Sequence, residues 1–235
     1  MTEALFKEDA YLQGCEATVT GLSERGVVLS RTVFYPQGGG QPGDRGVLET
    51  RDGRRVVICD TLKGEQDDIL HVPHPDTPPL AVGEQVNATV DWDRRYRHMR
   101  MHTCLHLLCS LVDAGVTGGA VGSDRGRLDF DLPDATPDKI ELSEALNRLI
   151  ERDVPVQARW ISVQALVDQP ELVRTMSVKP PMDQGNVRLI DVVGVDLQPC
   201  GGTHVARTGE IGNVRVSKIE KKSRHNRRVV VNFVE

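Results

Sequence analysis

The chain has 235 residues, of which 39% are hydrophobic and 27% charged, and its formal net charge at pH 7 is -5. This composition is typical of a globular protein and excludes a uniformly basic nucleic-acid-binding surface, although local basic patches are compatible with it. The sequence contains neither an apolar run of about 18 residues nor a secretory signal pattern, so we expect a cytoplasmic protein without a membrane span. The length suffices for one large or two small domains.

Residues 1–92 are predicted to form a small β-barrel domain. Four stretches, residues 15–22, 26–34, 54–60 and 85–91, have the apolar and β-branched composition of strands. The segment 71–79 is too rich in proline for a strand or a helix. We therefore expect a loop there, in which His71 and His74 are solvated.

A glycine-rich motif, Phe-Tyr-Pro-Gln-Gly-Gly-Gly-Gln-Pro-Gly-Asp, occupies residues 34–44. Three consecutive glycines allow the backbone to come very close to a ligand or to another backbone segment. The motif lacks the Lys-Ser/Thr ending of a phosphate-binding P-loop, so it predicts no nucleotide site. By itself it is typical of a turn.

Residues 94–114 are predicted to form a helix, because Leu105, Leu108 and Leu111 recur at helical spacing. Asp93 stands where an N-cap belongs, and Gly115 stands where the helix is expected to end.

Two histidines of this helix, His102 and His106, are four residues apart, so both imidazoles lie on one face and can share a metal ion. A zincin peptidase requires glutamate directly after the first histidine, and here that position is Thr103. The pair is therefore not a peptidase motif. Taken alone, it is more typical of core packing.

The segment Cys-Gly-Gly-Thr-His, residues 200–204, supplies a thiol and a third imidazole. With the helical pair, Cys200 and His204 complete a tetrahedral set for one divalent metal ion, for which zinc is favoured over copper or iron. Cys109, three residues after His106, is predicted to be a packing residue because the set is already complete. The five cysteines have no regular spacing and do not suggest a disulfide framework.

Residues 93–235 are predicted to form an α+β domain. Residues 118–123 are expected to be flexible, and the alternating residues 126–132 to form a strand. After a second helix, residues 154–161 return as a strand, and the buried strand region 183–195 leads into the Cys-Gly-Gly-Thr-His turn. The predicted buried face of the second helix consists of Ile140, Ala145, Leu146, Leu149 and Ile150.

Residues 212–233 are predicted to form a hairpin whose connection is strongly basic. Such a density of positive charge suits a nucleic-acid phosphate backbone, although a solvated turn explains it equally well. Four arginines at the start of the metal-bearing helix offer an alternative surface. The candidates in the hairpin are Lys218, Lys221, Lys222, Arg224, Arg227 and Arg228, and those in the helix are Arg94, Arg95, Arg97 and Arg100.

Four motifs in this order resemble the editing domain of alanyl-tRNA synthetase. The metal motifs are also similar to those of the threonyl-tRNA synthetase editing domain. Because the chain is short and has no recognisable ATP-binding aminoacylation domain, it resembles the free-standing AlaX-type editing proteins in their intermediate-length form. The motifs are Phe34-Tyr35 with Gly39-Gly40-Gln41-Pro42-Gly43-Asp44, His102-x-x-x-His106, Arg127-Leu128-Asp129-Phe130, and Cys200-Gly201-Gly202-Thr203-His204.

The resemblance implies a trans-editing hydrolase whose partner is tRNA(Ala) carrying a wrong amino acid, serine or glycine. It makes Gln41 and Thr32 candidates for holding the serine hydroxyl or the attacking water. It makes Asp129 a carboxylate that orients a ligand, binds the substrate amine or satisfies buried backbone groups. It also implies one Zn²⁺ per chain, with the ligands His102, His106, Cys200 and His204.

Two other classes of function stay open at this point, a zinc-stabilised tRNA-binding module without turnover and a metallohydrolase of a small ester or amide. The role of the metal is open as well, because four protein ligands fill a tetrahedral zinc, whereas a catalytic zinc commonly has three. The oligomeric state is left open by the sequence.

Overall fold

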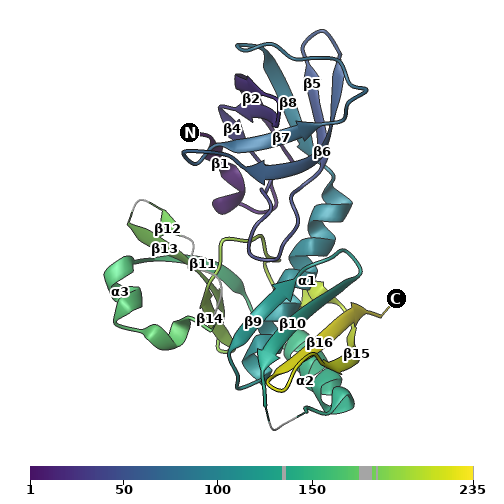
Figure 1. Ribbon diagram of the computed structural model, residues 1–235, viewed down its shortest axis with the longest axis vertical. Coiled ribbons are helices and arrows are strands. Elements are labelled where there is room, and N and C mark those ends of the chain that lie inside the picture. Colours follow the sequence, from purple (N-terminus) through teal and green to yellow (C-terminus); the bar gives the residue numbers. More distant parts are fainter. Residues whose placement is uncertain (134–135, 175–181, 184, 235) are drawn as a thin grey trace. The chain divides into compact units, whose positions relative to one another are not determined.

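The computed structural model describes residues 1–133, 136–174, 182–183 and 185–234. They pack into two compact units, unit 1 (Met1–Tyr96) and unit 2 (Arg97–Glu235). The predicted α+β class with an N-terminal barrel is confirmed (Figure 1). That the two parts are separate domains divided after residue 92 stays a prediction. Among the helices of the described residues, none is long and apolar enough to cross a membrane.

Unit 1 is built on a closed antiparallel barrel (Figure 1). Its side chains alternate between the interior and the outside, so that in the last strand Val86, Ala88 and Val90 are buried while the residues between them are exposed. Two short strands, β1 (Glu3–Ala4) and β4 (Arg31–Thr32), pair in parallel, and a 3-10 helix (Leu5–Lys7) follows β1. The barrel order is β2 (Gly14–Ser23), β3 (Gly26–Leu29), β7 (Ile69–Pro73), β6 (Arg55–Lys63), β5 (Gly46–Thr50) and β8 (Gln85–Val90).

The prediction of a solvated loop at His71 is wrong, because this residue belongs to β7 and is fully buried. Its Nδ1 lies 3.1 Å from the Val27 carbonyl oxygen and its Nε2 lies 2.8 Å from Thr32 Oγ1. A carbonyl oxygen only accepts, so Nδ1 carries the proton and Nε2 accepts from the Thr32 hydroxyl. Burial lowers the pKa of His71 to about 4, so the ring is neutral at neutral pH. His74 is half-exposed.

The glycine-rich motif folds as the predicted tight turn. Gly38 and Gln41 exchange backbone hydrogen bonds of 3.1 and 2.9 Å, and the two glycines between them have positive φ angles, which favour glycine. At the end of the motif, Asp44 forms an ion pair with Arg95, and both side chains are almost completely buried. Asp44 also accepts a 2.6 Å hydrogen bond from the Tyr35 amide. A buried charge pair therefore anchors the motif within unit 1.

Helix α1 (Trp92–Leu111) begins slightly earlier than predicted. The carboxylate of Asp91 accepts a 3.2 Å hydrogen bond from the Arg94 amide, so Asp91 caps the helix and the assignment of Asp93 is wrong. Residues 97–111 of the helix belong to unit 2.

The main sheet of unit 2 packs against α1. A Cβ on Gly126 would lie only 2.7 Å from Met101 Sδ of the helix, so glycine is needed for this close approach. Because successive residues of a strand point to opposite faces, Leu128 and Phe130 share the face of Gly126, and Asp129 lies on the other face. The strand order is β15 (Val214–Lys221), β16 (Asn226–Phe233), β10 (Arg125–Asp131) and β9 (Val116–Ala120), all antiparallel.

At one edge of this sheet the structure corrects the sequence prediction, and at the other it shows a contact that was not predicted. Strand β9, at one edge, includes residues 118–120, so the predicted flexibility of that segment is wrong. At the other edge, α2 (Lys139–Glu151) lies along β15, and its Asn147 exchanges hydrogen bonds of 3.0 and 2.8 Å with the backbone of Val214. The hydroxyl of Ser143 accepts a 2.9 Å hydrogen bond from the Val216 amide. The helix thus satisfies outward-facing backbone groups of Val214 and Val216, at the start of β15.

The second helix buries a narrower stripe than predicted. Leu142, Leu146 and Ile150 of α2 are buried, whereas Ile140 is 62% exposed. Two residues correspond to a rotation of about 200° around a helix, which places Ile140 and Leu142 on nearly opposite sides.

A second sheet carries the turn that contains the predicted thiol ligand. In it, β13 (Asn186–Val192) pairs antiparallel with β11 (Val156–Ser162), β12 (Met182–Asp183) and β14 (Asp196–Pro199). The remaining elements are α3 (Val163–Val167) and the 3-10 helices Pro170–Leu172 and Thr208–Ile211.

Candidate metal centre

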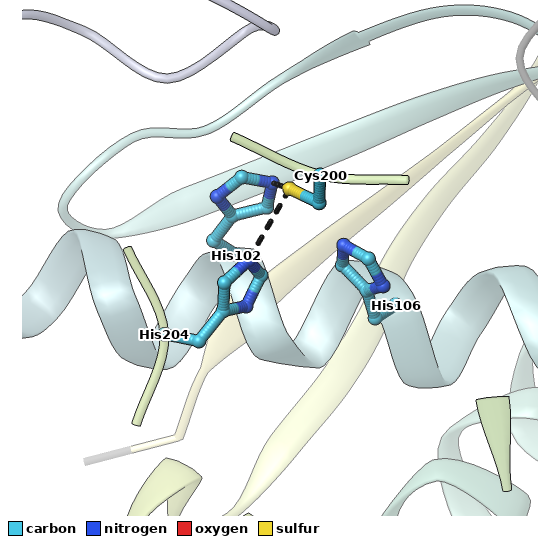
Figure 2. Close-up of side chains that lie close together, drawn as sticks. All are labelled: His102, His106, Cys200 and His204. Atoms are coloured by element: carbon cyan, nitrogen blue, oxygen red, sulfur yellow. Dashed lines mark hydrogen bonds between the residues drawn. The ribbon is translucent and has the colours of Figure 1, made fainter. Parts of the chain in front are cut away.

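Two segments of unit 2 that are distant in the sequence bring the four predicted ligands together (Figure 2). His102 and His106 project from one face of α1, with ring centroids 5.5 Å apart. Cys200 and His204 lie in the turn that follows β14. The candidate ligand atoms all lie within 4.8 Å of one another. The three histidines are buried, and Cys200 is partly buried.

The spacing of the four side chains fits tetrahedral coordination. Cys200 Sγ lies 3.5 Å from His102 Nε2 and 3.3 Å from His204 Nε2. With metal bonds of about 2.3 Å to sulfur and 2.05 Å to nitrogen, tetrahedral angles would place a sulfur and a nitrogen ligand about 3.6 Å apart. The group could therefore hold a divalent metal ion. Cys109 is buried in the core and lies outside this group.

Hydrogen bonds to Nδ1 of His106 and of His204 determine which nitrogen of each ring would face a metal ion. His106 Nδ1 lies 2.9 Å from Asp196 Oδ2, and His204 Nδ1 lies 3.1 Å from Thr103 Oγ1. The Gln198 amide donates to both oxygens of Asp196, each at 2.9 Å. With Nδ1 occupied, Nε2 of both rings is left for the metal. These partners were not predicted from the sequence, although Asp196 and Gln198 alternate along a strand and so share a face.

The backbone of the Cys200 turn is braced by Arg188, a basic residue in the otherwise buried strand β13. Its Nη1 donates to the carbonyl oxygens of Cys200 and Gly202, both at 2.9 Å. The Gly202 amide in turn donates to Cys200 Sγ at 3.4 Å. The thiol is thus delivered from a turn that a neighbouring strand holds in place.

The electrostatics of the group favour metal-binding forms. Burial alone would raise the pKa of the Cys200 thiol, but the charges on His102 and His204 lower it well below its usual range. Burial, together with the charge on His102, lowers the pKa of His204. A thiolate and a neutral imidazole are the forms that bind a metal. His106 is the exception, because in spite of burial the hydrogen bond to Asp196 raises its pKa to about 10, so this ring would have to release a proton to bind a metal.

The three predicted catalytic residues lie in different surroundings. Thr32 is fully buried in unit 1, where its hydroxyl donates to His71. Gln41, 1% exposed, lies in the glycine-rich turn of the same unit. Asp129, in unit 2, lies on the face of the main sheet opposite α1 and accepts hydrogen bonds from Arg228 at 2.7 and 2.9 Å and from Arg127. Catalytic roles for these three stay predictions.

The six basic residues of the hairpin do not form one cluster on a turn. The turn itself is short, and four of the six lie within β15 and β16. Arg227 is buried and donates to the carbonyl oxygen of Pro133 at 3.0 Å. Within the part of the chain that the structure describes, Lys221 and Arg224 are exposed and have no partner. The remaining three form ion pairs: Lys218 and Lys222 with Glu220, and Arg228 with Asp129.

Comparison with known proteins gives matches along the whole chain. A family described as tRNA synthetases class II (A) matches residues 3–94, and the threonyl and alanyl tRNA synthetase second additional domain matches residues 187–230. The alanyl-tRNA editing protein AlaX-M of Methanosarcina mazei is 36% identical over 248 residues, covering 100% of this chain and 98% of the relative.

Two longer relatives match as well. The alanyl-tRNA editing protein AlaX-L of Pyrococcus horikoshii is 32% identical, over 96% of this chain and 56% of its own length. An alanine–tRNA ligase of Saccharolobus islandicus is 29% identical, over 94% of this chain and 25% of its own length. The resemblance that the four motifs predicted is thereby confirmed. Since it is more than 30% identical to AlaX-M over the full length of both chains, the chain belongs to the AlaX family of alanyl-tRNA editing proteins.

Proposed function

We propose that the chain is a trans-editing hydrolase, which removes a wrong amino acid from tRNA(Ala) by cleaving the aminoacyl ester at the tRNA 3' end. The observation that carries the proposal is a buried group of three histidines and one cysteine, in a chain similar over its full length to alanyl-tRNA editing proteins. Serine is the favoured substrate, and glycine is the second.

A separate hydrolytic site has a physical reason. A synthetase pocket made for alanine rejects the slightly larger serine poorly, because one small group changes binding by only about 1–3 kcal/mol. Discrimination by a second site that destroys the wrong ester overcomes this limit. The substrate ester is activated, so no protein nucleophile is required.

We propose zinc as the resident metal, because one thiolate and three imidazoles in a tetrahedral arrangement are typical zinc ligands. When bound, and with its coordination expanded beyond the four protein ligands, it would supply either Lewis-acid polarisation of the ester carbonyl or a water whose pKa is about 7. The protein's part is orientation: Asp196 and Thr103 hold the rings of His106 and His204 with Nε2 toward the ion.

Among the predicted catalytic residues, Thr32 has little hydrogen-bonding capacity left for a substrate. The hydroxyl of Thr32 donates to His71 and accepts a 3.0 Å hydrogen bond from the Phe34 amide, so its hydrogen-bonding capacity is largely used inside the barrel.

The test is deacylation of Ser-, Gly- and Ala-tRNA(Ala) by the purified, metal-loaded protein. We expect rapid loss of serine, slower loss of glycine and retention of alanine, with activity abolished by a chelator and restored by Zn²⁺. Binding of tRNA without deacylation would instead indicate a metal-stabilised binding module. Hydrolysis of small esters irrespective of tRNA would indicate a metallohydrolase of a different class.

A further inference from the structure

One face of the main sheet of unit 2 carries most of its long basic side chains. This is the face opposite α1, and we refer to it as the basic face. Successive residues of one strand point to opposite faces of a sheet, and residues that pair between neighbouring strands point to the same face. These two rules identify the members of the basic face. The basic face comprises Arg125, Arg127, Asp129 and Asp131 of β10, Asn226, Arg228, Val230 and Asn232 of β16, Arg215, Lys218 and Glu220 of β15, and the adjacent Lys222.

The basic side chains stand in two columns. Arg125 and Arg127 form the column on β10, and Arg215 and Lys218 form the column on β15. Between them runs β16, whose residues at these two levels, Asn232 and Val230, are smaller. Neighbouring strands are about 4.8 Å apart, so the columns are about 10 Å apart. Figure 1 shows these three strands side by side, with α1 behind them. The face is thus a strip of small side chains between two rows of cations.

Two carboxylates of the face order its cations without neutralising them. Asp129 lies between Arg127 and Arg228, with Arg228 as a two-point partner. Glu220 lies between Lys218 and Lys222, at 2.5 and 3.4 Å. Each of these two carboxylates is shared by two cations, so each group of three retains one positive charge. Side chains held in this way lose less conformational entropy when they bind an anion.

The charge of the face is opposite to that of the whole chain. It has six basic and three acidic side chains, whereas the chain has a net charge of -5. Arg125 and Arg215 are exposed and, among the described residues, form no ion pair. A positive strip on a negative protein attracts a polyanion to one place and orients it.

We infer that the basic face binds the phosphate backbone of tRNA, and that the hairpin turn is not the main tRNA contact. This inference rests on the proposed function. Of the six hairpin residues that the sequence suggested, Lys218, Lys222 and Arg228 lie on the basic face and Arg227 is buried, which leaves only Lys221 and Arg224 near the turn. The alternative surface at the start of α1 is also occupied, since Arg97 donates to the Ser123 carbonyl oxygen and Arg100 to that of Ile211.

The experiment compares three double neutralisations in the full, metal-loaded chain. The face pair is Arg125→Gln with Arg215→Gln, and the turn pair is Lys221→Gln with Arg224→Gln. The control pair on α2, Lys139→Gln with Arg148→Gln, removes the same charge elsewhere on unit 2. All six side chains are exposed, so folding should be preserved. The probe is tRNA(Ala) without an attached amino acid, and its affinity for each protein is measured over a range of salt concentrations.

For the face pair we expect the slope of log affinity against log salt to flatten by about 1.4 to 1.8, the loss of two phosphate contacts. The turn and control pairs should keep the slope of the parent protein. Charge reversal, Arg125→Glu with Arg215→Glu, should weaken binding further. Flattening by the turn pair alone, or equal slopes for all three pairs, would overturn the inference.

A parallel assay of Ser-tRNA(Ala) deacylation separates this inference from the proposed function. We expect the face pair to raise KM and leave kcat unchanged. A parent protein that binds tRNA through the face without deacylating it would refute the function and retain the inference. A parent protein that deacylates Ser-tRNA(Ala) while the face pair leaves both slope and KM unchanged would retain the function and refute the inference.

Discussion

Lowering the pH should destabilise the barrel through His71. The neutral ring is fully buried, donates from Nδ1 to Val27 and accepts at Nε2 from Thr32. A second proton, on Nε2, would disrupt the hydrogen bond from Thr32. Burial lowers the pKa of His71 from 6.5 to about 4. In the unfolded chain the ring takes up a proton below about pH 6.5, whereas in the folded chain it does so only near the lower value. The stability that depends on the neutral ring is therefore complete above pH 6.5 and is lost as the pH falls toward 4.

The size of the effect follows from the two pKa values. At pH 5 the pH lies about 1.5 units below the pKa of His71 in the unfolded chain, so proton binding stabilises the unfolded chain by about 2 kcal/mol. The loss of stability reaches about 3 kcal/mol near pH 4. This is a large part of the stability of an ordinary domain, about 5–15 kcal/mol. Other groups titrate in the same range, so the contribution of His71 has to be isolated by a variant.

The assay is urea unfolding of the parent and of His71→Gln between pH 8 and pH 5. Trp92 packs against the barrel core, and Trp160→Phe would make it the only tryptophan and hence a fluorescence reporter of unit 1. Glutamine retains a donor and an acceptor but does not titrate. The difference in unfolding free energy between the two proteins should shrink by about 2 kcal/mol from pH 8 to pH 5. A difference constant to within about 0.5 kcal/mol would refute the buried neutral histidine.

Three further predictions concern the metal centre and the basic face. Cys200→Ala should lose bound zinc and deacylation together, because the thiolate is a ligand, and stoichiometric zinc with normal activity in this variant would exclude the thiol from the site. Asp196→Ala should lower metal affinity about 10- to 100-fold in a chelator competition, because His106 loses the acceptor that fixes its ring, and affinity equal to that of the parent would contradict the orienting role. Asp129→Asn should weaken tRNA binding by releasing Arg127 and Arg228 while metal content and kcat stay unchanged. A collapse of kcat there would instead support the catalytic role that the sequence resemblance implies.

The four candidate ligands could be predicted from the sequence because their spacing is local. His102 and His106 are separated by one helical turn, and Cys200 and His204 by one short loop, so each pair is visible in a few residues. The groups that orient them were not predicted. Asp196 is 90 residues from His106 in the sequence, and the two meet only through the fold of unit 2.

Composition was a poorer guide where tertiary pairing decides the structure. The prolines around His71 suggested a loop, yet Pro73 ends β7, where the absence of an amide donor is tolerated. In the hairpin, the number of basic residues predicted a nucleic-acid contact, but it did not show which of them point to the same face of the sheet. Arg227 and Arg228 are adjacent in the sequence, but one is buried among carbonyl oxygens and the other lies on the basic face.

The contact between α2 and β15 bears on how the chain avoids association with itself. The exposed edge of a sheet is a template for a strand from another molecule, and proteins protect such edges to prevent aggregation. Here Ser143 and Asn147 occupy the outward amides of Val214 and Val216 and the carbonyl of Val214, so the first part of the β15 edge is closed to strand addition. The opposite edge, β9, is only five residues long and contains two adjacent glycines, a poor template for an intermolecular strand. Continuous sheets running from one molecule into the next are therefore disfavoured at both edges.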